Sequence, residues 1–277
     1  MRMDASILSK VLKALGYVMI LFLAGIIFQS YYAVVILTWR PHFLHGSPVA
    51  IIVVILFHLL LIMLVWSYFK AVLSDPGSVP ENWTPPDSEN RRIRYNLCVK
   101  CRRWKPPRCQ HCSLCQRCVL KMDHHCVWIG NCVGARNYKF FLLFLIYGFL
   151  EALLVSMALL PTVVNTVKKG NERSWSSGSL STVLLSFVLS LAFVVSLIFF
   201  IGMHVSLVLS NATSIEINEK RAATSWKYDV GRRNNVEQVF GSKVILWFFP
   251  LFSKEDEENI PPLRGFEFPT RLETGFQ

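Results

Sequence analysis

The stretch from Cys98 to Cys132 reads CVKCRRWKPPRCQHCSLCQRCVLKMDHHCVWIGNC. It holds all eight cysteines of the 277-residue chain and three of its seven histidines. Cysteine thiolates and imidazoles are ligands that Zn²⁺ prefers in proteins. This concentration of both residue types in so short a stretch predicts a segment that bound metal holds together.

The ligand spacing repeats with a shift of 14 residues. Each copy is a Cys3His set, which closes a tetrahedral shell around a structural Zn²⁺ and leaves no position for a metal-bound water. Two interleaved structural zinc ions would hold the segment in one shape without a hydrophobic core. The first set is Cys98, Cys101, His111 and Cys118, and the second set is Cys112, Cys115, His125 and Cys132.

Other pairings of these residues stay open at this point. Cys115 has the same two-residue gap to Cys118 as to Cys112. A zinc-ribbon arrangement would join the first Cys-x2-Cys pair to the second. A disulfide framework is disfavoured, because the segment is predicted below to face the reducing cytosol.

The 14-residue pairing leaves Cys109, Cys126 and His124 without a metal to bind. Cys126 follows Asp123, His124 and His125 directly. A thiol beside an imidazole and a carboxylate has the composition of an activated nucleophile, because the imidazole can take the thiol proton and the carboxylate can orient the imidazole. Cys109 has no base beside it, so we expect an inert thiol.

The run Asp123-His124-His125-Cys126 inside a cysteine-rich segment resembles the DHHC family of protein S-acyltransferases (palmitoyltransferases). The resemblance implies that Cys126 carries the acyl group, His124 is the base, Asp123 orients it and His125 binds zinc. The family's zinc pairing matches the 14-residue solution. Palmitoyl-CoA as acyl donor and a two-step reaction that ends on cysteines of membrane-associated proteins are further implications.

Three shorter motifs extend this resemblance over residues 12 to about 241. Asp75-Pro76-Gly77 matches the family's DPG motif, which follows the second membrane span. Thr213-Ser214-Ile215-Glu216 resembles the TTxE motif, with Ser214 in place of the second threonine. There the resemblance implies that Thr213 and Ser214 support the site through a hydroxyl close to Asp123. Asn235-x3-Val239-Phe240-Gly241 matches a C-terminal family motif.

Composition places the chain in a membrane. It is 53% hydrophobic with a net charge of +11 and a positive mean hydropathy, which is too apolar for an ordinary soluble domain. Apolar stretches over 11–37, 49–72, 138–164 and 184–209 are each long enough to span, and each is expected to be helical. The fold class is therefore an all-α integral membrane protein, with four transmembrane helices and a two-zinc cytosolic domain between helices 2 and 3. The predicted parts are 1–72, 73–137, 138–210 and 211–277.

The basic residues indicate orientation. Of the lysines and arginines, 25 lie on one side of the predicted spans and four on the other. The positive-inside rule puts both termini and the zinc segment in the cytosol. We expect an endomembrane location, the Golgi first, with plasma membrane or vesicles as alternatives. Nucleic acid is not expected as a partner, because the basic residues flank the spans. A purely scaffolding zinc module would not need the spare Asp-His-Cys set.

The third span is expected to line the acyl chain. Glu151 lies inside it, and a carboxyl within a membrane helix is treated as functional by default. Trp128 would cover the first acyl carbons, as the resemblance implies, while Phe141 and Phe144 line the wall and Glu151 helps to close the far end. Basic candidates for the CoA phosphates are Arg117, Lys121, Arg136 and Lys139.

The C-terminal part is predicted to contain an interfacial segment and a tail. Residues 244–252, VILWFFPLF, are too few to span a membrane and are expected to lie on its surface or against the helices. Residues 253–277 are charged and contain proline, and we expect them to form a loose tail.

Overall fold

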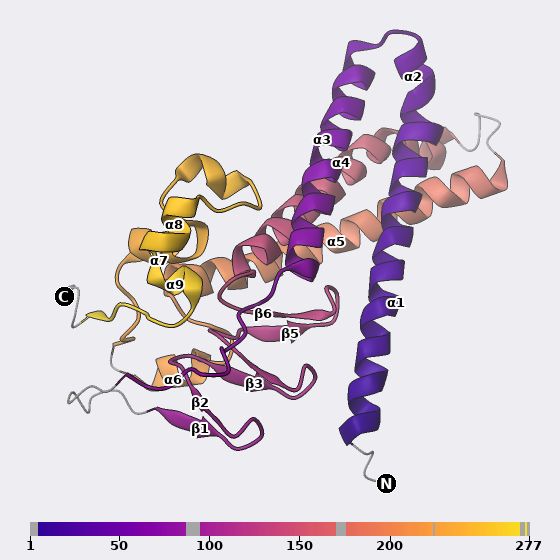
Figure 1. The fold of residues 1–277 in the computed structure, drawn as a ribbon. Helices are drawn as coiled ribbons and strands as arrows, with labels where there is room; N and C mark the ends of the chain where they lie inside the picture. The colour runs from indigo at the N-terminus through magenta and orange to yellow at the C-terminus, as the bar shows by residue number, and fades with distance from the viewer. Residues whose placement is uncertain (1–4, 87–94, 170–175, 224, 272–274, 276–277) are drawn as a thin grey trace. The chain divides into compact units, whose positions relative to one another are not determined.

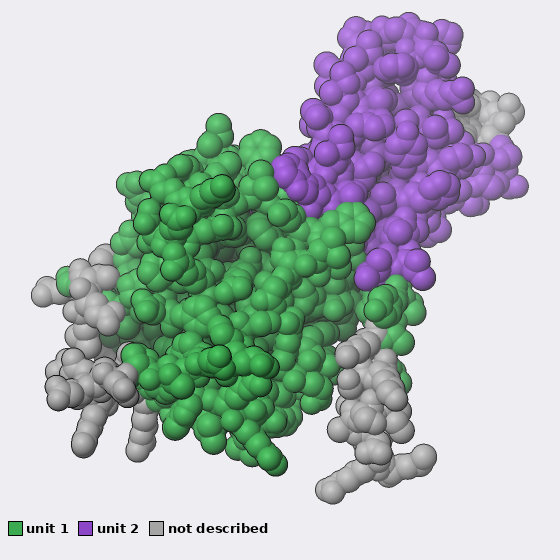
Figure 2. Space-filling view, viewed as in Figure 1, with its two compact units in different colours: residues 1–19, 67–143, 203–277 green, residues 20–66, 144–202 purple. Residues whose placement is uncertain are grey.

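A computed structural model describes the chain except residues 1–4, 87–94, 170–175, 224, 272–274 and 276–277. Residues 78–96, whose proline-rich and polar sequence predicts a linker, and the polar residues 165–180 between the third and fourth predicted spans therefore lie partly outside the described residues. The chain forms two compact units (Figure 2). Unit 1 contains residues 1–19, 67–143 and 203–277, and unit 2 contains residues 20–66 and 144–202.

Four long helices run through the chain (Figure 1). Helix α1 (Ala5–Tyr31) continues into the π-helical segment η1 (Tyr32–Trp39) and the short α2 (Arg40–Leu44). The others are α3 (Pro48–Leu73), α4 (Tyr138–Lys169) and α5 (Ser177–Leu209). Four helical stretches among the described residues are long and apolar enough to cross a membrane. This confirms the predicted fold class, a four-helix membrane protein with its Cys-rich domain between the second and third spans.

Helix α5 begins seven residues before the predicted start at 184, and hydroxyl groups explain how its polar first turns stay helical. Ser181 Oγ donates to the Ser177 carbonyl at 2.8 Å, and Thr182 Oγ1 donates to the Gly178 carbonyl at 2.9 Å. The hydroxyl groups thus donate hydrogen bonds to carbonyl oxygens of the preceding helical turn, which is compatible with a helix. The predicted helix starts too late because these first residues are polar, although they are part of the helix.

Unit 2 is built from the apolar parts of the long helices. Its core packs small residues against large ones, which lets the helices approach closely. Trp39 anchors the end of η1, where Nε1 donates to the Ala158 carbonyl at 3.2 Å. The buried core residues are Ala33, Val34, Phe57, Leu154, Val155, Ala158, Leu159 and Val183.

Unit 1 contains three antiparallel hairpins with one repeated plan (Figure 1). They are β1 (Asn96–Cys98) with β2 (Arg103–Lys105), β3 (Gln110–Cys112) with β4 (Arg117–Val119), and β5 (His124–Cys126) with β6 (Asn131–Val133). Each begins 14 residues after the one before. The ligand repeat thus reflects a repeat of the backbone that the sequence analysis did not predict.

The C-terminal region belongs to unit 1. It contains α6 (Ile217–Ala222), α7 (Arg232–Phe240), the 3-10 helix η2 (Val244–Phe248), α8 (Lys254–Asn259) and α9 (Pro261–Arg264). The prediction of a loose tail from residue 253 is wrong over its described part. Ser253 caps α8 by accepting from the Asp256 N–H, and Leu263 and Phe268 are buried. A few well-placed anchors thus order a stretch whose composition is mostly polar.

Candidate active site and metal clusters

The eight predicted ligands come together in two groups. One is Cys98, Cys101, His111 and Cys118, and the other is Cys112, Cys115, His125 and Cys132. The Nδ1 atom of His125 lies 3.4–3.7 Å from the three sulfurs of its group, and Cys115 Sγ lies 3.5 Å from Cys132 Sγ. Tetrahedral Zn²⁺ with its usual bond lengths separates its ligand atoms by about 3.6–3.8 Å. The two groups therefore fit two zinc ions, grouped as the 14-residue pairing predicts and not as its alternatives.

Each metal group joins two consecutive hairpins. The first hairpin supplies Cys98 from the end of β1 and Cys101 from its turn, while the second supplies His111 and Cys118, which face each other across β3 and β4. The second and third hairpins are joined in the same way through the other group. Zinc would therefore fix the third hairpin, β5–β6, against the second. It would supply structural cross-links here, since both shells are full.

Cys126 ends strand β5 and lies outside both metal groups. His124 Nδ1 donates to Asp123 Oδ2 at 2.6 Å, so Nε2 is the ring nitrogen left for the hydrogen bond that His124 forms with Cys126. Asp123 is 2% exposed and Cys126 is 7% exposed. The structure thus places the three predicted catalytic side chains in the order carboxylate, imidazole, thiol.

The hydrogen bonds among Asp123, His124 and Cys126 favour a protonated His124 beside an ionised Asp123. Burial lowers the pKa of His124, but its hydrogen bonds to Asp123 and Cys126 outweigh burial and raise the pKa to about 9. Burial alone would raise the pKa of Asp123, but the hydrogen bond and charge of His124 and the Ser214 N–H lower it. Asp123 is therefore ionised and stabilises an imidazolium on His124.

A polar and aromatic wall from α4 and α5 covers the imidazole of His124. His204 is fully buried, and Tyr138 Oη lies 2.9 Å from its Nδ1. The ring centroid of His124 lies 5.9 Å from that of His204 and 5.3 Å from that of Phe141. Phe141, predicted to line the acyl chain, therefore contacts the imidazole of His124. His204 could not be assigned to the site from sequence, because one histidine in an apolar helix carries no spacing signal.

Asp123, His124 and His204 also place potential metal-ligand atoms within 4.8 Å of one another. The 2.6 Å separation of His124 Nδ1 and Asp123 Oδ2 is a hydrogen-bond distance, and it is shorter than the roughly 3.3 Å between two ligands of one tetrahedral zinc. We therefore interpret this group as a hydrogen-bonded active site and not as a third zinc site.

The turn after α5 reaches Asp123 as the TTxE resemblance implies. Ser214 N donates to Asp123 Oδ1 at 2.8 Å, and Ser214 Oγ donates to the Asp123 carbonyl at 2.7 Å. The Ser214 hydroxyl thus contacts the backbone of Asp123, while the Ser214 backbone N–H contacts the Asp123 carboxylate. Thr213 contributes within the turn, where its N–H donates to Glu216 Oε2 at 2.9 Å.

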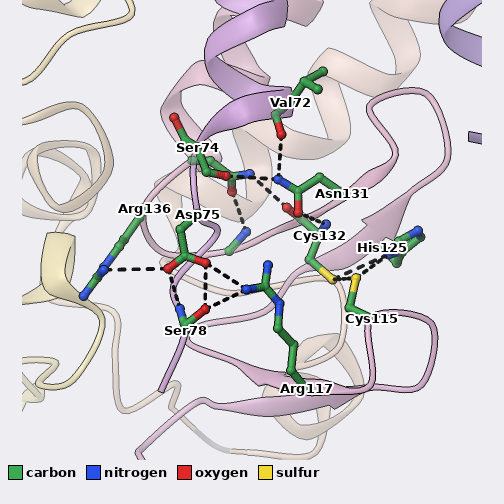
Figure 3. A network of polar contacts seen from close by, with 12 residues as sticks. Val72, Ser74, Asp75, Ser78, Cys115, Arg117, His125, Asn131, Cys132 and Arg136 are labelled. Atoms are coloured by element: carbon green, nitrogen blue, oxygen red, sulfur yellow. Dashed lines mark hydrogen bonds and ion pairs between the residues drawn. The ribbon is translucent and has the colours of Figure 1, made fainter. Parts of the chain in front are cut away.

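The DPG motif connects helix α3 to the hairpins (Figure 3). Asp75 accepts from Ser78 and forms ion pairs with Arg117, at 3.1 Å, and Arg136, at 3.7 Å. These contacts lower the pKa of Asp75 against the opposing effect of burial. Gly77, at φ +118°, lets its carbonyl accept from Leu120 N at 2.9 Å. The turn that ends α3 is therefore fixed to the end of β4, which leads into the hairpin β5–β6, the candidate catalytic hairpin.

Two asparagines dock the catalytic hairpin on the end of α3. Asn131 Nδ2 points at the helix end in Figure 3 and lies within 3.4 Å of the carbonyls of Ala71, Val72 and Ser74. Asn137 Nδ2 donates to the carbonyls of Ala71 and Cys132. The carbonyls of Ala71 and Val72 lie in the last turn of α3, where no backbone donor within the helix is left for them. The hairpin thus caps a membrane helix.

The remaining predicted residues are placed in different surroundings. Trp128 lies in the turn after Cys126, and its carbonyl accepts from Tyr68 Oη at 3.1 Å. Phe144 and Glu151 belong to unit 2, while Cys126 belongs to unit 1. Lys121 and Lys139 are buried against the protein's own oxygens, those of Asn211 for Lys121 and the carbonyls of Phe240 and Leu251 for Lys139. This corrects the expectation that these two lysines contact CoA phosphates.

Cys109 is 3% exposed, and burial raises the pKa of its thiol to about 12. A buried thiol with a raised pKa is a poor nucleophile. The structure therefore fits the prediction that Cys109 is inert.

Comparisons with known proteins agree with this geometry. The family model for DHHC palmitoyltransferase matches residues 91–221. The chain is 51% identical to Probable protein S-acyltransferase 12 of Arabidopsis thaliana, over 94% of this chain and 95% of that protein. It is 45% identical to Probable protein S-acyltransferase 14 of the same plant, over 94% and 92%. It is 35% identical to Palmitoyltransferase ZDHHC15A of Danio rerio, over 91% and 85%. The chain belongs to the DHHC palmitoyltransferase family of protein S-acyltransferases.

Proposed function

We propose that this acyltransferase moves a palmitoyl group from palmitoyl-CoA to cysteine thiols of membrane-associated proteins, through an S-acyl intermediate on Cys126. The observation that carries the proposal is the series of hydrogen bonds from Asp123 through His124 to Cys126. Cys126 lies on hairpin β5–β6, which, unlike the other two described hairpins, has no second cysteine three residues after the first. The two zinc ions would hold this hairpin in place.

In the first step, His124 takes the proton of Cys126 and the thiolate attacks the carbonyl carbon of the thioester. The bond from that carbon to the CoA sulfur breaks, and the imidazolium returns its proton to the CoA thiolate. In the second step, His124 deprotonates the acceptor cysteine, whose sulfur attacks the acyl carbonyl carbon. The bond from that carbon to the Cys126 sulfur breaks, and the imidazolium returns its proton to the Cys126 thiolate. Each step exchanges one thioester for another, so little free energy is lost.

The membrane helices would hold the acyl chain. Trp128 would cover the first carbons, with Phe141 and Phe144 along the wall and Glu151 towards the far end. Thr213 and Ser214 would support Asp123. We place both termini and the zinc domain in the cytosol of an endomembrane, the Golgi first, so that acceptor proteins approach from the cytosolic face.

The test uses purified full-length protein with labelled palmitoyl-CoA, followed by hydroxylamine and then by a cysteine-containing acceptor peptide. We expect a hydroxylamine-labile label on Cys126 that moves to the peptide after free palmitoyl-CoA is removed. Transfer to the peptide without any label on the enzyme would contradict the two-step route.

A further inference from the structure

Arg108 is enclosed almost completely within unit 1. Its side chain is 1% exposed, and its guanidinium lies between the rings of Tyr228 and Phe268, at 4.5 and 4.9 Å from their centroids. Its backbone is left-handed, at φ +59°, a conformation that L residues other than glycine rarely adopt. A buried cation in an unusual backbone conformation indicates that the surroundings demand its exact position.

Four hydrogen bonds from the guanidinium define that position. Nε and Nη2 donate to the two carboxylate oxygens of Glu216, at 2.8 and 2.6 Å. Nη1 and Nη2 donate to the side-chain and backbone oxygens of Asn211, both at 2.9 Å. Such a planar fork holds a carboxylate in one orientation, which lysine cannot do.

Glu216 is hydrogen-bonded to both ends of the turn Thr213–Glu216, which contacts Asp123 through Ser214. Glu216 Oε2 accepts from Thr213 N at 2.9 Å, and Thr213 Oγ1 accepts from Glu216 N at 3.3 Å. The reciprocal pair fixes the backbone on both sides of Ser214. Ser214 N then donates to Asp123 Oδ1, whose second oxygen accepts from His124.

We infer that Arg108 and Glu216 are positioning residues that fix the Asp123–His124 pair, through hydrogen bonds to the Thr213–Glu216 turn and through the backbone from Thr213 to Ser214. The inference rests on the proposed role of Cys126 and His124. A buried ion pair is in itself weak evidence for stability, because apolar replacements are often as stable. The role inferred for the Arg108–Glu216 pair is to orient the turn Thr213–Glu216 next to Asp123.

The experiment compares Arg108→Lys and Glu216→Gln with a matched control, Arg103→Gln. Arg103 lies in the first hairpin, and its guanidinium pairs with Glu81 at 3.0 Å, with both side chains largely exposed. Purified variants are assayed for zinc per protein, for the fraction that loads with palmitoyl, and for the loading rate as a function of palmitoyl-CoA. We expect about a tenfold or greater loss of the saturated rate in the first two variants. Their zinc content, loaded fraction and half-saturating concentration should not change, and Arg103→Gln should match the wild type.

Ser214→Ala, alone and combined with Glu216→Gln, tests the path itself. If Glu216 acts through the turn, the combined loss of rate is smaller than the product of the two single losses. Wild-type rates in both Arg108→Lys and Glu216→Gln would overturn the inference. So would loss of zinc in both, since the pair would then serve the fold alone. Absence of label on the wild type would instead contradict the proposed function.

Discussion

Cys126 and Cys112 occupy the same position in two hairpins that start 14 residues apart, since each ends its first strand and pairs across the sheet, with Asn131 and Arg117 respectively. Cys112 has Cys115 three residues on and joins a metal group. Cys126 has Ile129 at that place, which is 1% exposed. The proposed nucleophile, Cys126, therefore occupies the position of a zinc-binding cysteine in a hairpin that lacks the second thiol, and its sulfur lies outside both metal groups.

The first prediction concerns this position. Cys126→Ser should abolish the hydroxylamine-labile label while two zinc ions per protein and the melting temperature stay near wild type, because Cys126 belongs to neither metal group. Metal content is measured by mass spectrometry and loading with labelled palmitoyl-CoA. A labelled Cys126→Ser protein would show that another residue is the nucleophile.

Substitutions of the adjacent residues His124 and His125 should have different effects on zinc content and on rate. His124→Ala should keep both zinc ions and lose base catalysis, typically ~10²–10⁴-fold in rate. His125→Ala should lose one zinc ion, since His125 Nδ1 lies among three cysteine sulfurs. Equal zinc loss in the two variants would contradict this division of roles.

The two metal groups should differ in their importance for catalysis. The group of Cys112, Cys115, His125 and Cys132 includes both strands of the catalytic hairpin, while the other group does not. Cys115→Ser should therefore reduce acyl loading more than Cys101→Ser, although the two cysteines hold equivalent places in the repeat. Loading is compared at matched protein amounts and zinc is counted in each. A greater loss in Cys101→Ser would show that the first hairpin, and not the third, limits activity.

Sequence spacing predicted the two metal groups because zinc ligands recur at fixed intervals whatever the intervening residues are. The role of Cys126 as nucleophile stays a prediction. The three hairpins escaped prediction, since three-residue strands leave no alternating pattern to detect. Arg108 and His204 escaped for another reason. Each acts through partners distant in sequence, Glu216 for Arg108 and Tyr138 for His204, and a single residue gives no periodic signal. The folded C-terminal stretch depends on isolated anchors such as Phe268 in otherwise polar sequence.

Cys109→Ser should be nearly silent in zinc content and acyl loading. Cys109 lies outside both metal groups, and its buried thiol has a raised pKa. Its burial allows a modest loss of stability, which thermal unfolding would detect. Loss of a zinc ion in this variant would mean that the 14-residue pairing needs revision.

Glu151 provides the last prediction, which concerns the length of the acyl chain. It lies on α4, eleven residues past Phe140, which is roughly 16 Å along the helix. It is 7% exposed, and neither carboxylate oxygen has a hydrogen-bond partner among the described residues. A buried carboxyl without such a partner is costly, which favours a functional role over simple packing. If Glu151 helps to close the acyl cavity, Glu151→Ala should increase the use of stearoyl-CoA and longer donors relative to palmitoyl-CoA. Glu151→Gln, which keeps the side-chain size, should retain the wild-type preference. The measurement is acyl loading with donors of increasing length, and an unchanged profile in folded Glu151→Ala would remove Glu151 from the acyl site.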